Sequence, residues 1–321
     1  MKHIFVIDPK SFFDETWKMD IIYKDVEEYF DTQENPDYSI VISKYRRDAV
    51  FLIQTQVDKL KDGDSVRVYA IGGNEIIFDC LNGIAGLPNV EFAMMPIEEG
   101  TCDFLRSFGE GSAEYFKDIK SLIRAPVIST DVIDMGRLYA INTCIIGFDA
   151  AVPFKINELN KRLGREINDE SFYFFNRIVS FFGNMVVALD KQIISQHYNI
   201  SIDDNDYSGN YCLINIANGS YYNGDKITVT GAIPDDGLLN VALFKSAGLL
   251  HNMRFMKNYS RGKTPSSDCI RLQAKKISLQ SDDLIWIQVD GEYFQDKKIT
   301  FEAAPGMLRL AVVNNMTYQI F

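Results

Sequence analysis

The sequence lacks several features that would assign it to a common class at once. It has 33 Lys and Arg against 44 Asp and Glu, which gives a formal net charge of −11. A strongly acidic chain has no general attraction to nucleic acid or to an anionic lipid surface, so we expect no nucleic-acid partner. No hydrophobic run approaches the ~18 residues that a membrane-spanning helix requires.

Cysteine and histidine are scarce and scattered. The 5 cysteines and 3 histidines form no Cys-x-x-Cys pair and no zinc-type cluster. The cysteines stand in apolar runs, which indicates buried, reduced thiols and a cytoplasmic protein. Met1 leads directly into the apolar run HIFVI, so no signal peptide is visible. The fingerprint Gly-x-Gly-x-x-Gly is also missing, which removes the main support for a hydride-transferring Rossmann enzyme.

The residue pattern changes once, near residue 125. Over 1–124, apolar runs (HIFVI, SIVIS, VRVYAI, VEFAMMPI) alternate with helical spacing that begins at Trp17 and again near Val50. This alternation predicts an α/β domain with a mostly parallel sheet. Over 125–302, short β-type runs follow one another between Gly, Asn and Asp, among them LYAINTCIIGF, KITVTGAI, KKISLQ and LIWIQVDG. This pattern predicts a β-sandwich or a curved antiparallel sheet. One helical stretch, 169–192, interrupts them.

The segment AIGGNEIIFDCLNG joins a strand, two glycines and a helical stretch. A strand that enters a helix through Gly72 and Gly73 presents backbone N–H groups to a phosphate. Glycine pairs are also common in plain turns, and Glu75 places a negative charge where a phosphate would bind. The turn alone therefore leaves a nucleotide site and a purely structural role open.

Several segments in a fixed order support the interpretation of the glycine turn as part of a nucleotide site. They are DPKS, SKYRRDA, GGNEIIFDCLNG, PIEEGTCDFLRSFG, IPDDGLL and IQVDGE. This order resembles the diacylglycerol kinase catalytic-domain family, which is related to sphingosine kinases and more distantly to NAD kinases. The resemblance covers nearly the whole chain. It implies a cleft between the two domains as the site, and a chain end, about 303–321, that packs back on the first domain.

Two motifs keep the family's acidic residues. In IPDDGLL the resemblance implies a Mg²⁺ site with the Asp236 carboxylate and the backbone carbonyls of Ile233 and Leu238, and hard oxygen ligands suit this ion. Asp-Gly is also a common hairpin turn, which is the alternative. In IQVDGE the resemblance implies that Asp290 and Glu292 lie near the transferred phosphate, with Glu292 as proton acceptor. If the strand continued, both side chains would project to one side. A solvated turn is the alternative here.

The nucleotide loops depart from the family's pattern. The residues that the resemblance places at the nucleotide are Ser43, Gly72, Gly73, Asn74, Glu75, Gly100 and Thr101. Asn74 replaces an Asp, Glu75 a Gly and Ile76 a Thr, which removes polar contributions and adds a negative charge beside the phosphates. Either ATP binding is weakened, or Glu75 itself supplies the missing carboxylate to Mg²⁺.

Two further groups of residues allow a binding role but are more typical of ordinary structure. The five phenylalanines that would line an acyl-chain cleft, or simply form core, are Phe172, Phe174, Phe175, Phe181 and Phe182. The basic residues that would touch a head group, or simply lie in solvent, are Lys44, Arg46, Arg47, Lys161, Arg162 and Arg165.

Taken with the resemblance, the sequence predicts an ATP- and Mg²⁺-dependent lipid kinase that phosphorylates a hydroxyl group of a diacylglycerol-like lipid. The alternative is a catalytically impaired member of the family that binds a lipid or a nucleotide. NAD kinase is a weaker third hypothesis, because IPDDGLL and IQVDGE match the lipid branch better. The expected partners are the lipid substrate and, transiently, a membrane surface, and the resemblance also allows a homodimer.

Overall fold

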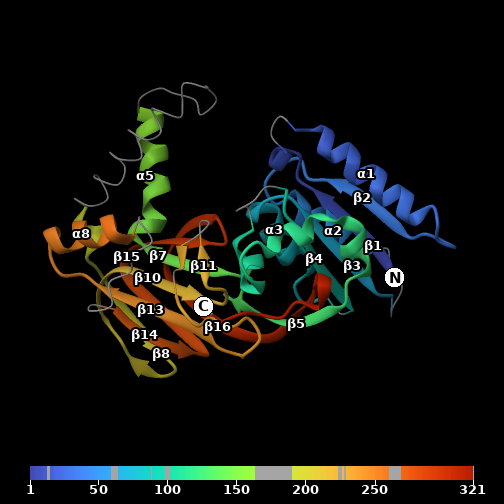
Figure 1. The fold of residues 1–321 in the computed structure, drawn as a ribbon. Helices are drawn as coiled ribbons and strands as arrows, with labels where there is room; N and C mark the ends of the chain where they lie inside the picture. The colour runs from blue at the N-terminus through green and yellow to red at the C-terminus, as the bar shows by residue number, and fades with distance from the viewer. Residues whose placement is uncertain are drawn as a thin grey trace.

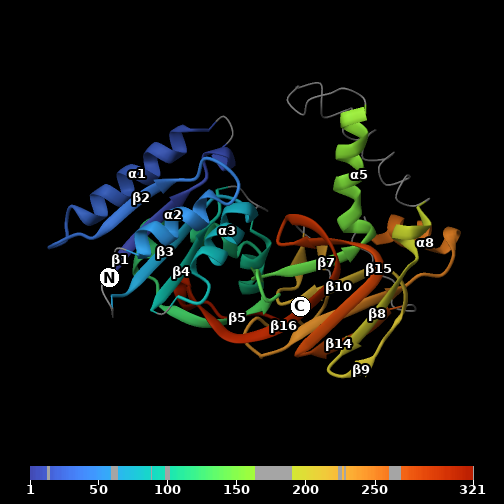
Figure 2. The ribbon, with the colours of Figure 1, turned by 180° about the vertical axis from the view of Figure 1, so that it is seen from behind.

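The computed structural model describes the chain except residues 13–14, 59–63, 88, 98–101, 163–189, 223–225, 228, 260–268 and 321. Figure 1 shows an N-terminal part with helices over a sheet, beside a C-terminal part that is mostly β-structure. Figure 2 shows the same ribbon from behind, where β5 and β16 run from one part to the other. The expected mixed α/β and β-rich parts are therefore both present.

The elements of the N-terminal part are β1 (Lys2–Ile7), η1 (Pro9–Phe12), α1 (Trp17–Phe30), β2 (Tyr38–Ile42), α2 (Asp48–Val57), β3 (Val66–Ile71), α3 (Asn74–Ile84), β4 (Val90–Met95), η2 (Asp103–Phe108), η3 (Ser112–Lys117) and α4 (Ile119–Arg124). Strands β1, β2, β3 and β4 pair in parallel, in the spatial order β2-β1-β3-β4. All residues of β3 and β4 are buried, as is typical of parallel strands covered on both faces.

The elements of the C-terminal part are β5 (Val127–Asp134), β6 (Tyr139–Ala140), β7 (Thr143–Gly147), α5 (Phe148–Arg162), α7 (Lys191–Ile194), β8 (Gln196–Ile202), β9 (Asn205–Asp206), β10 (Gly209–Ala217), β11 (Tyr221–Tyr222), β12 (Lys226–Ile227), β13 (Leu239–Lys245), α8 (Leu249–Tyr259), β14 (Cys269–Ala274), β15 (Lys276–Val289), β16 (Glu292–Ala311) and η4 (Val313–Asn315). Hydrogen bonds connect the strands in the order β14-β13-β10-β7-β15-β16, and β8 pairs with both β10 and β15. The two-sheet sandwich itself stays a prediction.

Three predictions for this part need correction. Of the described residues in the expected run KITVTGAI, those of β12 alone form a strand, and the chain turns at Gly231, whose φ is +78°. The runs KKISLQ and LIWIQVDG lie in one strand, β15, with a register shift between Gln280 and Ile285. The run LYAINTCIIGF divides into β6 and β7, and its last residue begins helix α5, which the sequence did not predict. The predicted helix at 169–192 and the five phenylalanines lie outside the described residues, apart from 190–192.

The end of the chain lies against the N-terminal part. Leu310 of β16 pairs with Phe92 of β4, and the backbone N–H of Gln319 donates to the carbonyl of Ser107 at 2.8 Å. The ring of Tyr318 stacks on Phe108 at 4.7 Å between centroids. These contacts join the two parts, while the exact domain boundary at residue 124 stays a prediction. Among the described helices, none is long and apolar enough to cross a membrane.

Candidate active site in the cleft

Three pockets that share lining residues lie in and beside the cleft where the two parts meet. The outer pocket lies between Asp8, Lys10, Ser43 and the start of α3, and it shares Arg46 and Glu75 with the middle pocket. The middle pocket also holds Glu292, and it shares Gly291 with the inner pocket. The inner pocket lies between Asn74 of α3, η2 and the start of β7. The start of α3, at 74–77, and the acidic turn at 290–292, far apart in sequence, therefore line pockets that share residues.

The strand–turn–helix shape of AIGGNEIIFDCLNG is confirmed, because β3 leads through Gly72 and Gly73 into α3. Gly72 has a φ of +149°, and a Cβ atom there would lie 2.7 Å from Ser11 Oγ. The Ser11 hydroxyl accepts the N–H of Gly73 at 3.0 Å and donates to Asp8 Oδ2 at 2.7 Å. Ser11 of the DPKS segment thus packs against the turn and accepts a hydrogen bond from it. Only glycine fits at position 72.

The first turn of α3 carries the residues that depart from the family. Glu75 is exposed, but desolvation together with the nearby charges of Glu292 and Asp8 raises the pKa of its carboxyl group. Ile76 is 3% exposed and packs in the N-terminal core. The packing of Ile76 in the core therefore holds the shape of the turn. The carboxylate of Glu75 lies beside the turn, at the outer and middle pockets.

Asp290 does not share a face with Glu292. Strand β15 ends at Val289, and Asp290 and Gly291 have φ values of +44° and +91°. This left-handed turn breaks the alternation that the sequence predicted for the two carboxylates. The Asp290 carboxylate instead accepts backbone N–H groups of 141–143, two of them at 2.7 and 2.8 Å. Burial raises the pKa of Asp290 to about 6, against the opposing effect of these hydrogen bonds.

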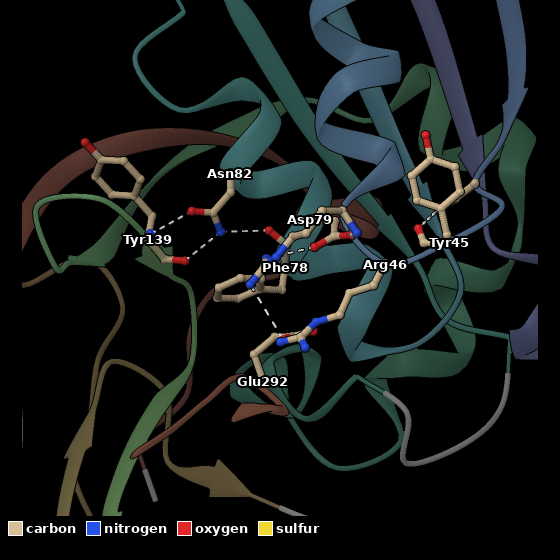
Figure 3. A network of polar contacts seen from close by, with 9 residues as sticks. Tyr45, Arg46, Phe78, Asp79, Asn82, Tyr139 and Glu292 are labelled. Atoms are coloured by element: carbon tan, nitrogen blue, oxygen red, sulfur yellow. Dashed lines mark hydrogen bonds and ion pairs between the residues drawn. The ribbon is translucent and has the colours of Figure 1, made fainter. Parts of the chain in front are cut away.

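Glu292 lines the middle pocket, and two arginines hold its carboxylate. Arg46 forms an ion pair and a hydrogen bond with its carboxylate, and Arg47 lies 3.6 Å from the same oxygen. Figure 3 shows Arg46 and Glu292 meeting beside Phe78 and Asp79 of α3. Glu292 comes from the C-terminal part and the arginines from the N-terminal part, so the contact joins the two sides of the cleft.

Arg47 also contacts α3 on its own side of the cleft. Its guanidinium lies 2.8 Å from Asp79 Oδ1, and its backbone N–H donates to Asp79 Oδ2 at 2.7 Å. The same guanidinium lies over the ring of Phe78 at 4.5 Å. The sequence favoured solvated faces for Arg46 and Arg47. That prediction is wrong for Arg47, whose side chain is only 35% exposed, because it faces a carboxylate from each part of the molecule.

The other predicted nucleotide residues are only partly described. Ser43 is buried, lines the outer pocket and donates its N–H to the carbonyl of Ile7 at 2.9 Å. Gly100 and Thr101 lie outside the described residues. Their neighbour Asp103, in the motif segment PIEEGTCDFLRSFG, is buried and lines the inner pocket, although it was not predicted as a site residue.

The predicted metal turn lies away from the cleft and is already hydrogen-bonded. Asp236 Oδ1 accepts the N–H of Leu238 at 2.9 Å, while the carbonyl of Ile233 accepts the N–H of Asp236 at 3.4 Å. Asp131 of β5 accepts the N–H of Gly237 at 2.7 Å, which brings a second carboxylate to the turn. Burial and the charge of Asp131 raise the pKa of Asp236. A cation would relieve this excess of negative charge, so the residues fit Mg²⁺. No cluster of three or more His, Cys, Asp or Glu side chains that could hold a metal occurs among the described residues.

The fold and the cleft define a two-part protein in which the start of α3, after a glycine turn, lies beside the buried Glu292. The family model for the YegS C-terminal NAD kinase beta sandwich-like domain matches residues 147–312, more than half of the 321 residues. The chain belongs to this family. The family membership that the motifs predicted is therefore confirmed.

Relatives and solved structures extend the likeness over the whole chain. A protein of Staphylococcus aureus strain Mu3 named "Putative lipid kinase" is 26% identical over 281 residues, which cover 87% of each chain. A Bacillus anthracis crystal structure described as "a putative diacylglycerol kinase" matches with a TM-score of 0.70 and 19% identity, covering 98% of each chain. A second structure from that organism, described as a diacylglycerol kinase, matches with a TM-score of 0.65, again at 19% identity and 98% coverage. The fold is shared from end to end.

Proposed function

We propose that the protein is a lipid kinase that transfers the γ-phosphoryl group of ATP to a hydroxyl group of a diacylglycerol-like lipid bound in the cleft. The observation that supports this most is the place of Glu292. Its carboxylate comes from the C-terminal part, lies beside Glu75 and Gly291 in the middle pocket, and is held by Arg46. The names of the similar proteins agree with this activity.

The outer pocket has groups that fit a triphosphate. Helix α3 begins at Asn74, after Gly73 at the N-cap with no side-chain cap, and Lys10, Lys44 and Arg46 lie near its N-terminal end. Backbone N–H groups and cations of this kind hold phosphate oxygens. ATP, when bound there, supplies the phosphoryl group. Glu75 is then placed to hold Mg²⁺, because a cation would offset the negative charges that raise the pKa of its carboxyl group.

In the proposed reaction Glu292 takes the proton of the lipid hydroxyl group. The hydroxyl oxygen forms the new bond to phosphorus with its lone pair, and the bond from phosphorus to the bridging oxygen breaks, so that its electron pair leaves with ADP. Arg46 and Arg47 fix the carboxylate and offset negative charge in the cleft. Asp290 is a positioning residue in this proposal. Its hydrogen bonds to the backbone N–H groups of 141–143 fix the turn that presents Glu292.

The experiment measures phosphate transfer from ATP to diacylglycerol in mixed micelles. Glu292→Gln should reduce kcat by at least ~10²-fold, as expected for the loss of a positioned base. Glu302→Gln makes the same change on the same strand, at a half-exposed residue paired with Lys276, and should leave the activity unchanged. Equal activity of Glu292→Gln and the parent would reject the role of Glu292.

A catalytically impaired member of the family that binds a lipid or a nucleotide is the second candidate. The observation in its favour is that Glu75 stands at the mouth of the turn, where nearby carboxylates already raise the pKa of its carboxyl group. Calorimetric titration with ATP and Mg²⁺ distinguishes the two. If the parent binds ATP poorly and Asn74→Asp with Glu75→Gly and Ile76→Thr restores binding, the second candidate is correct. If instead the parent binds ATP with a micromolar Kd and the triple substitution weakens this binding, Glu75 contributes to the nucleotide site.

A transient membrane contact, a homodimer and the Mg²⁺ ion at Asp236 stay proposals of the same kind. The Mg²⁺ proposal rests on the two carboxylates that meet at the turn of 233–238.

A further inference from the structure

Helix α8 exposes one row of side chains along its length. Residues three and four positions apart share one face of a helix. The members of this row are Leu250, Met253, Arg254 and Lys257, and all four are exposed. Leu250 is 84% exposed and Met253 is 42% exposed, so two large apolar side chains lie in water. The buried residues of α8, on its other face, are Asn252, Phe255, Met256 and Tyr259. The core therefore holds the helix and fixes the direction of the exposed row.

The sequence around α8 is basic. Over 237–267 there is no Asp or Glu, and the five basic residues are Lys245, Arg254, Lys257, Arg261 and Lys263. The whole chain has 44 Asp and Glu against 33 Lys and Arg, so this segment has the opposite sign to the protein as a whole. Among the residues that the structure describes, no carboxylate forms an ion pair with Arg254. Local positive charge of this kind attracts an anionic partner.

Helix α1 provides the contrast within the same molecule. It also exposes two large apolar side chains, Trp17 at 55% and Ile21 at 47%. Its acidic residues are Asp20, Asp25, Glu27 and Glu28, and its basic residues are Lys18 and Lys24. Exposed apolar groups thus stand among mainly negative charges on α1 and among positive charges on α8.

The exposed row of α8 fits an anionic lipid surface better than a protein. A stable protein interface buries roughly 800 Å² on each partner. Two apolar side chains on a helix of 11 residues provide only a small part of that area. In a two-fold dimer the same surface meets itself, so the basic side chains of two copies would lie opposite one another. A lipid surface requires only shallow entry of apolar side chains and phosphate groups near the basic ones.

Helix α8 is one helix away from the middle pocket. The ring of Phe255 lies 5.9 Å, between centroids, from the ring of Phe148, the first residue of α5. Pro153 and Phe154 of α5 line the middle pocket together with Glu292. Figures 1 and 2 both show α8 beside the base of α5. A membrane that contacts α8 would therefore lie near the pocket in which the lipid is proposed to react.

We propose that the exposed row of α8 binds a membrane surface that contains anionic lipid. Leu250 and Met253 enter the head-group layer, and the guanidinium of Arg254 binds a lipid phosphate group. This inference rests on the proposed function, which requires a lipid substrate and therefore a contact with lipid. It adds the surface that makes the contact and the charge of the lipid that the surface prefers.

Sedimentation of the full-length protein with vesicles tests the contact without ATP. Vesicles of phosphatidylcholine alone are compared with vesicles of equal parts of phosphatidylcholine and phosphatidylglycerol. We expect the partition coefficient to be at least ~10-fold higher for the anionic vesicles, and to fall as NaCl is added because salt screens exposed charges. Equal partition into the two kinds of vesicle would overturn the inference.

Variants connect the binding to α8. Leu250→Ser and Arg254→Gln should each lower the partition coefficient by at least ~3-fold, since they remove one apolar contact and one charged contact. Both residues are exposed, so the variants should fold as the parent does. The controls are Ile21→Ser on α1 and Lys298→Gln on β16, which make the same kinds of change at exposed residues and should leave partition unchanged. Unchanged partition of the double variant Leu250→Ser with Arg254→Gln would contradict the assignment to α8.

Phosphate transfer provides a second readout. The double variant should have a raised KM for dioleoylglycerol in anionic vesicles, and an unchanged kcat and KM for dioctanoylglycerol presented without vesicles. An unchanged KM in vesicles would contradict the membrane role of α8. If no lipid is phosphorylated, the proposed function fails, and sedimentation with vesicles still decides the inference. A protein that does not bind vesicles but forms a dimer that Leu250→Ser abolishes, as measured by analytical ultracentrifugation, would assign this face to a second copy and overturn the inference.

Discussion

Arg46 and Glu292 form an ion pair across the cleft, although 246 positions separate them in the chain. The Glu292 side chain is 5% exposed and that of Arg46 is 61% exposed, so the contact joins a buried carboxylate to a guanidinium at the rim. Figure 3 shows the pair beside Phe78 and Asp79 of α3. A phosphate that competes for Arg46 would loosen this pair and leave Glu292 to the lipid hydroxyl group, which links nucleotide binding to the readiness of the proposed base.

Arg47 should contribute more to stability than its neighbour Arg46. Arg47→Ala leaves the carboxylate of Asp79, with a side chain 6% exposed, without its guanidinium. We expect the free energy of unfolding to fall by about 2 kcal/mol, less than for a fully buried pair because Arg47 is partly exposed. Arg46→Ala removes a guanidinium at the surface and should cost less than about 1 kcal/mol. Urea denaturation measures both values, and equal losses would contradict the difference.

Asp290 should make the free energy of unfolding depend on pH. The sign of this dependence is opposite to that of an ordinary salt-bridged aspartate. Its pKa is raised from 3.8 to about 6 by burial, so the folded state binds its proton more tightly than the unfolded state. The stability that this proton provides is present below about pH 4 and is lost as the pH rises through about 6.

The variant Asp290→Asn isolates this effect, because it cannot ionise. The difference in unfolding free energy between parent and variant should change by about 2 kcal/mol between pH 4 and pH 7, since one pKa unit corresponds to ~1.4 kcal/mol. Denaturant titrations at these two pH values provide the measurement. A difference that does not vary with pH would show that Asp290 titrates at its ordinary value.

Gly72 should tolerate substitution less well than another glycine with positive φ. In Gly72→Ala the new Cβ atom would lie 2.7 Å from Ser11 Oγ and 2.8 Å from Ile76 Cγ2, at a φ of +149°. We expect a loss of about 2–3 kcal/mol from strain and displaced packing. Gly86→Ala, where φ is +77° and no atom lies within 4 Å, should lose only about 1 kcal/mol. Thermal melting compares the two, and similar losses would mean that the Ser11 contact has no importance.

Mg²⁺ should stabilise the protein through Asp236. Binding to the native state alone raises stability by mass action, by about 1.4 kcal/mol when the ion is at tenfold its dissociation constant. Asp236→Ala should abolish the rise in Tm, and Asp282→Ala, an exposed change elsewhere, should keep it. A parent whose Tm does not respond to Mg²⁺ would end this proposal.

The sequence by itself determined the local features of this protein. Alternation of apolar runs and helical spacing predicted β1 to β4 and the helices α1 to α3, because each pattern reports which face of a short segment is buried. The glycine turn was readable because Gly72 and Gly73 follow a strand and precede a helix. The motif order was sufficient to identify the family.

Only the tertiary structure decided which of these features meet. The contacts of Arg46 with Glu292, of Asp290 with 141–143, and of Arg47 with Asp79 join segments far apart in the chain. A charged residue has the same appearance in a sequence whether water or a carboxylate surrounds it. Burial by neighbouring segments makes the difference, since it excludes water and forces each polar group to find a partner.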